Sequence, residues 1–365
     1  MTSKAFGLAQ LGNAYADGAL SNRNKIINGA MTIDQRNAGA AVTINSTANT
    51  YTLDRWAASG QLTDGVYTVD QITEAPAGFA NSARITVTTA DASIGATQIY
   101  LFQQFVEGFN FADLDFGKSS AKSVTLSFWA RSSVTGTFSG ALGNSANDRA
   151  YPFTYAISSA NTWEYKTITI AGDTTGTWLT DSGRGVAVRF AIGLGSNHVA
   201  TAGAWTGTSS IFGATGAVNL IETLSATLDL TGVQLEAGDT ATPFEHRSYG
   251  AELALCQRYF QQFDVFPGPS FASFIGYYGG SNVLSPVQRL SVPMRVTPTI
   301  AIANSGVEYY SFGLAWTGTT LTAIPRSSEM YYIYCATDAD GRGKLLRNGS
   351  SGAGPNPIAS FSAEL

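Results

Sequence analysis

Val124-Thr-Leu-Ser-Phe-Trp-Ala-Arg131 is the clearest strand pattern in the chain. Two sets of residues alternate along it: Val124, Leu126, Phe128 and Ala130 in one set, and Thr125, Ser127, Trp129 and Arg131 in the other. Successive side chains of a strand point to opposite faces of a sheet, so this period of two predicts a strand with one face on a hydrophobic core. The stretch Trp163–Ile168 alternates in the same way and predicts a second strand.

Similar short runs, separated by clusters of Gly, Asn, Asp and Ser, recur between Asn28 and about Gly250. Further strands are predicted at Gly65–Thr73, Ser82–Thr89, Thr97–Val106, Val186–Leu194 and Leu224–Leu235. Gly232 interrupts the alternation of the last of these, which predicts a β-bulge. About eight to ten strands with no helical pattern between them predict an all-β fold, a two-sheet antiparallel sandwich of jelly-roll type.

The hydrophobic period changes at Tyr249, where residues 249–263 read YGAELALCQRYFQQF. Leu253, Cys256 and Phe260 fall on one helical stripe there, so we expect a short connecting helix. The β-rich region that follows predicts a second, smaller β-sandwich domain. Its strands are expected at Phe271–Tyr278, Gln288–Met294, Thr299–Ala303, Tyr309–Leu314, Met330–Ala336 and Ile358–Leu365.

The first residues differ from the rest, because apolar residues of 1–25 recur at helix-like spacing among Gly and Ala. A lone helix of this length is marginal in water, which favours an attachment segment that docks on another protein over a disordered terminus. We therefore expect four parts: an attachment segment at 1–25, a jelly-roll domain at 26–248, a connecting helix at 249–263 and a C-terminal β tip domain at 264–365.

Composition narrows the classes of function. Only 13% of the 365 residues are charged and the formal net charge is −5, which argues against a nucleic-acid partner. No run of about 18 apolar residues and no secretory signal appear, so we expect synthesis in the cytoplasm without membrane insertion. Cys256 and Cys335 are expected to be reduced and partly buried.

No residue pattern indicates catalysis, so we expect a protein that is not an enzyme and uses no cofactor or metal. The two histidines, His198 and His246, are far apart in the sequence, and no Gly-x-Ser-x-Gly elbow occurs. Asp113 and Asp115, like Asp338 and Asp340, lie in short polar turns unsuited to glycoside hydrolysis. The turn that begins at Asp338 lacks the later acidic ligands of a calcium loop and reads as a hairpin turn.

Aromatic residues are the candidates for ligand binding, because sugar rings stack their C–H faces on exposed aromatic side chains. The candidates are Tyr277, Tyr278, Tyr309, Tyr310, Trp316 and Tyr331 in the C-terminal region, and Trp178 and Trp205 in Gly- and Thr-rich loops of the first domain. Adjacent residues of a strand face opposite ways, so one Tyr of each pair leaves the core. That residue contacts a receptor, packs at a subunit interface or is exposed to solvent. Arg and Lys are too sparse to indicate an anionic glycan.

Several long motifs resemble a bacteriophage or prophage tail-fibre family. The motifs are Asn24–Met31, Thr52–Trp56, Val124–Arg131, Leu230–Arg247 and Glu252–Phe260. The resemblance covers roughly 24–260, with a vaguer likeness at Val292–Thr299 and Phe361–Leu365. It implies a jelly-roll domain similar to carbohydrate-binding modules, homotrimeric assembly and attachment to a phage tail.

Two of these motifs carry charges that we interpret as structural. Asp54, Arg55 and Trp56 are expected to clamp a loop onto the sandwich, because buried charges need partners. Glu245, His246 and Arg247 are expected to form an interdomain hydrogen-bond network, since a single His lacks the companion ligands that zinc requires.

Together these observations predict a tail-fibre, receptor-binding protein of a virion. Its expected partners are copies of itself in a homotrimer, another virion protein bound through 1–25, and a glycan of the host cell surface. The alternatives are a capsid-decorating or head-fibre protein of the same fold and a glycan depolymerase.

Overall fold

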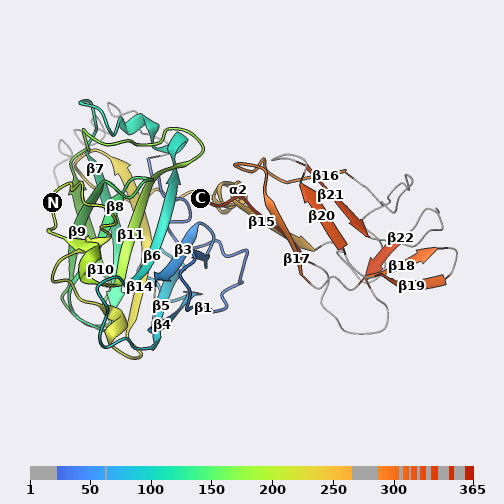
Figure 1. Ribbon diagram of the computed structural model, residues 1–365, viewed down its shortest axis with the longest axis horizontal. Helices are drawn as coiled ribbons and strands as arrows, with labels where there is room; N and C mark the ends of the chain where they lie inside the picture. Colours follow the sequence, from blue (N-terminus) through green and yellow to red (C-terminus); the bar gives the residue numbers. More distant parts are fainter. Residues whose placement is uncertain are drawn as a thin grey trace. The chain divides into compact units, whose positions relative to one another are not determined.

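The computed structural model describes residues 23–61, 64–264, 287–303, 307–311, 314–318, 321–325, 330–335, 345–348 and 358–365. The chain divides into two compact units, unit 1 (Met1–Glu252 with Leu365) and unit 2 (Leu253–Glu364). In the described residues of each unit, the regular secondary structure is nearly all β-strand (Figure 1). Among the described residues, no helix has the length and hydropathy that crossing a bilayer requires.

Unit 1 contains two six-stranded sheets. Sheet 1 is formed, in spatial order, by β1 (Val42–Ile44), β4 (Val66–Ile72), β5 (Ser82–Thr89), β14 (Thr227–Ala237), β7 (Val124–Ser132) and β10 (Glu164–Ile170). Sheet 2 is formed by β2 (Thr50–Tyr51), β3 (Trp56–Gln61), β6 (Ile99–Glu107), β11 (Arg184–Leu194), β8 (Gly136–Gly143) and β9 (Ala150–Ile157). Neighbours within both sheets are antiparallel, and the chain crosses repeatedly between them, as in the predicted jelly-roll sandwich.

Short elements complete unit 1. They are the parallel pair β12 (Val199–Ala200) and β13 (Gly213–Ala214), and the 3-10 helices η1 (Gly108–Asn110), η2 (Ala112–Leu114), η3 (Ser196–His198) and η4 (Leu220–Glu222).

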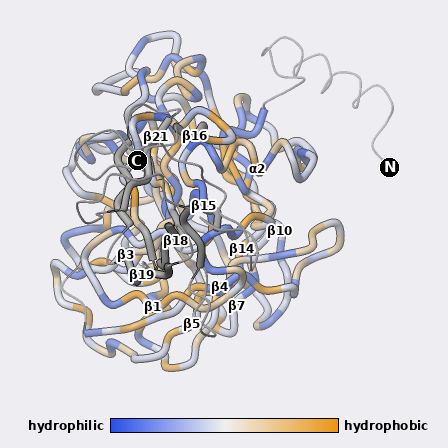
Figure 2. The backbone as a smooth tube through the Cα atoms, turned by 90° about the vertical axis from the view of Figure 1, so that its right-hand side faces the viewer, coloured by the Kyte–Doolittle hydropathy of each residue, from blue (hydrophilic) through white to orange (hydrophobic). Residues whose placement is uncertain are grey.

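The hydrophobic core lies between the two sheets, as the alternation predicts. Phe128 of β7 is fully buried and packs edge-on against Phe190 of β11, with ring centroids 5.0 Å apart. Hydrophobic and hydrophilic residues are interleaved along the chain rather than gathered in long blocks (Figure 2). The alternation is visible in the burial of strands such as β10, whereas β6 is buried along its whole length.

The bulge predicted at Gly232 is confirmed. The register between β14 and β7 shifts between Thr231 and Gln234, and Gly232 has a φ of +61°. This is the left-handed region, which glycine adopts without the steric cost of a Cβ atom.

The predicted helix at 249–263 is too long. Helix α2 covers Tyr249–Gln257, and Phe260–Asp264 forms strand β15, which pairs with β23 (Ile358–Ser362). Long-range strand pairing overrides the local helical pattern here, because the ladder satisfies the backbone of residues distant in sequence. The Cys256 side chain is fully buried, whereas the structure does not describe the side chain of Cys335.

The described strands of unit 2 form three three-stranded sheets. Their orders are β15-β23-β17, β16-β21-β20 and β19-β18-β22. The strands not yet given are β16 (Val287–Arg289), β17 (Thr299–Ala303), β18 (Val307–Ser311), β19 (Leu314–Gly318), β20 (Leu321–Pro325), β21 (Met330–Cys335) and β22 (Leu345–Asn348).

Most strands expected in unit 2 have a counterpart, with two corrections. The strand expected at Tyr309–Leu314 belongs to two strands, because β18 ends at Ser311 and Leu314 begins the antiparallel strand β19. The strand expected at Gln288–Met294 ends at Arg289, and the structure has a loop over 290–294. The strand expected at Phe271–Tyr278 lies outside the described residues.

Candidate functional site

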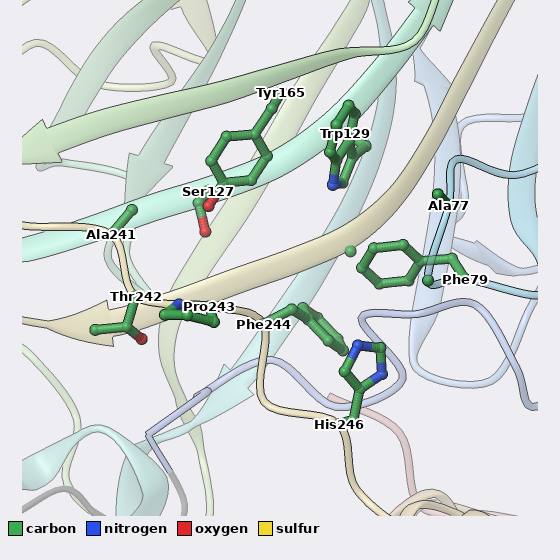
Figure 3. A pocket seen from close by; sticks show the side chains of 12 residues that line it. Ala77, Phe79, Ser127, Trp129, Tyr165, Ala241, Thr242, Pro243, Phe244 and His246 are labelled. Atoms are coloured by element: carbon green, nitrogen blue, oxygen red, sulfur yellow. The ribbon is translucent and has the colours of Figure 1, made fainter. Parts of the chain in front are cut away.

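An apolar pocket of about 540 Å³ lies on the face of sheet 1 that points away from the core. The floor and one wall of the pocket come from three adjacent strands of sheet 1, which are β14, β7 and β10. The rim of the pocket comes from the β4–β5 loop and from the segment after β14. The lining residues are Ala77, Gly78, Phe79, Ser127, Trp129, Tyr165, Gly232, Ala241, Thr242, Pro243, Phe244 and His246. We call this the sheet 1 pocket (Figure 3).

One wall of the sheet 1 pocket is an aromatic pair. Trp129 of β7 and Tyr165 of β10 are partners in the strand register, and their ring centroids are 5.3 Å apart at an interplanar angle of 48°. Tyr165 is 45% exposed, a large fraction for an aromatic side chain of a sheet. Both residues alternate with core residues of their strands, so strand periodicity itself turns them outward.

The second wall is a cluster of three rings from two loops. Phe79, Phe244 and His246 meet with ring centroids 4.9 to 5.3 Å apart. Figure 3 shows these rings beside one another at the end of the pocket away from Tyr165.

Gly232 separates the two walls. A Cβ atom at this position would lie 2.7 Å from Phe79 Cζ and 3.1 Å from Trp129 Cδ1. The bulge thus brings a residue without a side chain to the floor of the pocket and leaves both aromatic walls in place.

The chemistry of the sheet 1 pocket suits an uncharged ligand with apolar faces and hydroxyl groups. Its volume lies within the usual range for small-molecule sites, and the hydroxyls of Ser127 and Thr242 line it. None of the twelve lining residues is acidic, whereas ordinary glycoside hydrolysis requires two carboxyl groups. The arrangement provides stacking surfaces without an acid and base pair.

Trp178 and Trp205, predicted as exposed platforms, belong instead to an internal aromatic cluster. Trp178 is only 8% exposed and packs against Phe116 at 4.9 Å between centroids. Trp205 is half-buried, lies 5.5 Å from Trp178 and donates a hydrogen bond from Nε1 to the Ala171 carbonyl at 2.7 Å. Their Gly- and Thr-rich loops fold back on the sandwich because burying two indoles removes much apolar surface from water.

The C-terminal candidates lie on several strands of unit 2. Tyr309 and Tyr310 are in β18, Trp316 is in β19 and Tyr331 is in β21. Tyr309 and Trp316 are partners in the register of their sheet, whereas Tyr331 belongs to a different sheet. Tyr277 and Tyr278 lie outside the described residues.

Asp54, Arg55 and Trp56 are each at most 1% exposed, which favours the structural interpretation of this motif. Asp54 accepts hydrogen bonds from the backbone and side chain of Gln35, at 2.6 and 2.7 Å. Arg55 donates to the Phe105 carbonyl.

Glu245 and Arg247 bind the first described segment of unit 1. Glu245 Oε2 accepts from the Asn24 amide at 2.8 Å, and Arg247 donates to the carbonyls of Asn24 and Ile26. These contacts lie within unit 1, so the interdomain part of the expected network stays a prediction. His246, expected in the same network, lines the sheet 1 pocket instead.

The sequence did not single out Phe79, Trp129, Tyr165 or Phe244 as ligand contacts. One signal was present, since Trp129 occupies a solvent-facing position of Val124–Arg131. Phe79 and Phe244 lie in loops, and no local pattern brings those loops together.

Among the described residues, no group of three or more His, Cys, Asp or Glu side chains is placed to hold a metal ion.

No protein-family model matches the chain, and no curated protein matches it in sequence. The tail-fibre resemblance of the sequence motifs therefore stays a prediction. Several solved structures share a partial likeness, each at low identity and with a TM-score below 0.5.

One of these structures is the enzymatically active domain of tailspike protein 4 of bacteriophage CBA120, at 14% identity and a TM-score of 0.33. The match covers 60% of this chain and only 22% of the tailspike chain. A putative sugar binding protein from Bacteroides thetaiotaomicron has 12% identity and a TM-score of 0.35, with 59% and 100% coverage. The family 11 carbohydrate-binding module of Clostridium thermocellum, in complex with a β-1,3-1,4-mixed-linked tetrasaccharide, has 13% identity, a TM-score of 0.27, and 57% and 99% coverage.

Proposed function

We propose that this chain is a saccharide-binding protein of a phage tail fibre, and that it attaches the virion to a glycan of the host surface by binding rather than by catalysis. The observation that carries the binding part is the sheet 1 pocket, with its two aromatic walls and hydroxyl-bearing lining. Pyranose rings stack C–H faces on such walls and direct their hydroxyls to the polar rim. The virion part rests on the sequence motifs that resemble tail fibres.

Replacing Trp129 or Tyr165 with alanine is expected to weaken saccharide binding by the full chain about thirtyfold or more. The reason is that aromatic anchors of a binding site commonly contribute about 2 kcal/mol or more, and about 1.4 kcal/mol corresponds to a factor of ten. The measurement is a screen of immobilised bacterial glycans, followed by calorimetric titration with the best ligand.

Matched variants separate binding from general damage. Tyr249→Ala removes a tyrosine that is 65% exposed outside the pocket, and Trp163→Ala removes a tryptophan that does not line it. Both are expected to bind like the unmodified chain. Equal binding by Trp129→Ala, Tyr165→Ala and these controls would reject the sheet 1 pocket as the site. Release of reducing ends from the bound polysaccharide would contradict a function of binding alone.

The proposal that the chain belongs to a phage tail fibre predicts its oligomeric state and its place in the virion. The intact chain is expected to have the mass of a homotrimer in solution, and an antibody against it is expected to label phage tails in electron micrographs. Labelling of heads would instead indicate a head-fibre or capsid-decorating protein. A monomeric mass would contradict the trimeric fibre.

A further inference from the structure

A second hollow lies on the outer face of sheet 2, away from the aromatic residues of the sheet 1 pocket. It is a small polar cleft of about 160 Å³ that contains two arginines, and we call it the arginine cleft. Its lining residues are Thr47, Asn49, Ser59, Gly60, Ile99, Leu101, Gln103, Phe105, Asn147, Arg184, Arg189 and Phe212.

Arg189 is built into the floor of the arginine cleft. It is only 2% exposed, and its guanidinium lies over the Phe212 ring, 4.8 Å from the centroid. Nε donates to Gln103 Oε1 at 3.2 Å and Nη2 donates to Asn147 Oδ1 at 2.6 Å. A Cβ atom at Gly143 would lie 2.5 Å from Nη1, so the absence of a side chain there makes room for the guanidinium.

Arg184 lies on β11, the same strand as Arg189, and also lines the arginine cleft. Its Nη2 donates to the Ser145 carbonyl and, at 3.2 Å, to the same Asn147 Oδ1 that Arg189 uses. Its guanidinium carbon lies 5.0 Å from the centroid of the Phe105 ring. Its Nε is buried and has no hydrogen-bond partner. Two cationic groups therefore share one amide oxygen, and at least one buried donor still requires an acceptor.

The positive charge of the arginine cleft is not balanced. None of its lining residues is acidic, and neither arginine forms an ion pair within the described part of the chain. Glu107 is the Cα partner of Arg184 in the register but does not line the cleft.

Burial and the neighbouring charge of Arg184 lower the pKa of Arg189 to about 9. Arg189 is therefore cationic at pH 7, and so is Arg184, because arginine side chains stay protonated in proteins. A buried charge without a counter-charge destabilises the fold, so a site of this kind is retained most readily where it serves a ligand.

We infer that the arginine cleft is a second binding site, and that it takes the carboxylate of an acidic sugar residue such as a hexuronate. Guanidinium groups bind carboxylates through paired, charge-assisted hydrogen bonds. The amides of Asn49 and Gln103 and the hydroxyl of Ser59 lie beside the arginines and match the hydroxyls of a sugar ring. The arginine cleft on sheet 2 would thus bind an acidic sugar residue, independently of the uncharged sugar that stacks in the sheet 1 pocket.

The test is a titration of the full chain at pH 7 and low salt with D-glucuronate. Neutral D-glucose and the methyl ester of glucuronate serve as uncharged probes, and acetate and inorganic phosphate serve as anions without a sugar ring. Glucuronate is expected to bind and to raise the melting temperature, because a ligand bound only by the native state stabilises it. The uncharged probes are expected to bind at least about tenfold more weakly, because they lose the charge-assisted hydrogen bonds. The simple anions are expected to bind at least about tenfold more weakly, because they lack the sugar hydroxyls that Asn49, Gln103 and Ser59 would contact.

Two variants test whether glucuronate binds in the arginine cleft. Arg189→Met and Arg184→Gln are each expected to lose glucuronate binding about tenfold or more. Arg189→Met is expected to melt no lower than the unmodified chain, because it removes a buried charge that has no counter-charge. Lys122→Met removes the same formal charge at an exposed position outside the cleft and is expected to bind normally.

The outcomes also separate this inference from the proposed function. Trp129→Ala is expected to retain glucuronate binding, since it alters only the sheet 1 pocket. Acetate or phosphate binding as tightly as glucuronate would show a plain anion site and overturn the acidic-sugar assignment. Undiminished binding by Arg184→Gln and Arg189→Met would overturn the site itself.

Discussion

Replacing Trp56 with alanine is expected to lower the free energy of unfolding of unit 1 by about 4 kcal/mol. Trp56 is fully buried and stacks on Phe102, with ring centroids 4.9 Å apart and planes 9° from parallel. Its Nε1 also donates to the Asn28 carbonyl at 3.0 Å. Alanine would leave a cavity that the packed sandwich cannot close and a carbonyl without its donor.

The backbone around Trp56 enlarges this effect. Asn28 (φ 57°), Met31 (φ 56°) and Arg55 (φ 70°) all have left-handed backbone conformations, which non-glycine residues adopt at a cost. The Asn28 side chain maintains this geometry by donating to the carbonyls of Ile33 and Asp54, at 2.8 and 2.9 Å. Trp56 therefore stabilises a strained junction as well as the core.

Urea denaturation, monitored by tryptophan fluorescence and by circular dichroism, measures this loss of unfolding free energy. Trp56→Phe is expected to cost only about 1–2 kcal/mol, because it keeps the stacking and loses the hydrogen bond. Trp163→Ala, at a half-buried surface position, is expected to cost at most about 1 kcal/mol. A loss for Trp56→Ala no larger than that of Trp163→Ala would contradict a structural role for this motif.

The fold of unit 1 could be predicted from sequence because its strands carry a local signal. Val124–Arg131 alternates strictly, and Ser82–Thr89 forms β5 with the predicted bounds. The end of helix α2 could not be predicted in this way. Phe260 fits a helical stripe as well as a strand, and its pairing with Ser362 depends on residues far along the chain.

The two proposed binding sites were harder to predict because each depends on a β-bulge. In a regular strand, Arg184 and Arg189 would face opposite sides of the sheet, since an odd number of positions separates them. A register shift between Arg184 and Val186 brings both guanidiniums into one cleft. The bulge at Gly232 likewise opens the floor of the sheet 1 pocket. The small number of Arg and Lys residues in the sequence therefore gave no indication that two arginines meet in one cleft.

Replacing Asp229 with alanine is also expected to have a large effect, and to lower the free energy of unfolding of unit 1 by about 3 kcal/mol. Asp229 is 1% exposed on β14 and lies between Arg84 of β5 and Arg131 of β7 in the register of sheet 1. It accepts hydrogen bonds from Arg84 Nε at 2.8 Å and Arg131 Nε at 2.7 Å. Hydrogen bonding to Asp229 raises the pKa of Arg84. Arginine side chains stay protonated even without such a partner, so both would remain charged after the carboxylate is lost.

Glu74 provides a matched control, because it contacts the same two arginines from the solvent side. Its Oε2 accepts from Arg131 Nη2 at 2.6 Å and from Arg84 Nη2 at 3.3 Å, yet its side chain is 58% exposed. Glu74→Ala is expected to leave the denaturation midpoint nearly unchanged, since solvent replaces an exposed partner. If both variants lost the same stability, burial of Asp229 would not be the cause of its effect.

Asp229 also joins the strands that carry the sheet 1 pocket, which links its stability effect to binding. β14 contributes Gly232 to the floor of that pocket and β7 contributes Trp129 to its wall. Without Asp229, the two arginines would keep only the exposed carboxylate of Glu74 as a shared partner, and their like charges would repel each other across β14. We therefore expect Asp229→Ala to weaken saccharide binding at temperatures where it is still folded, and Glu74→Ala to bind normally. Calorimetric titration of both variants, well below their melting temperatures, distinguishes this coupling from simple unfolding.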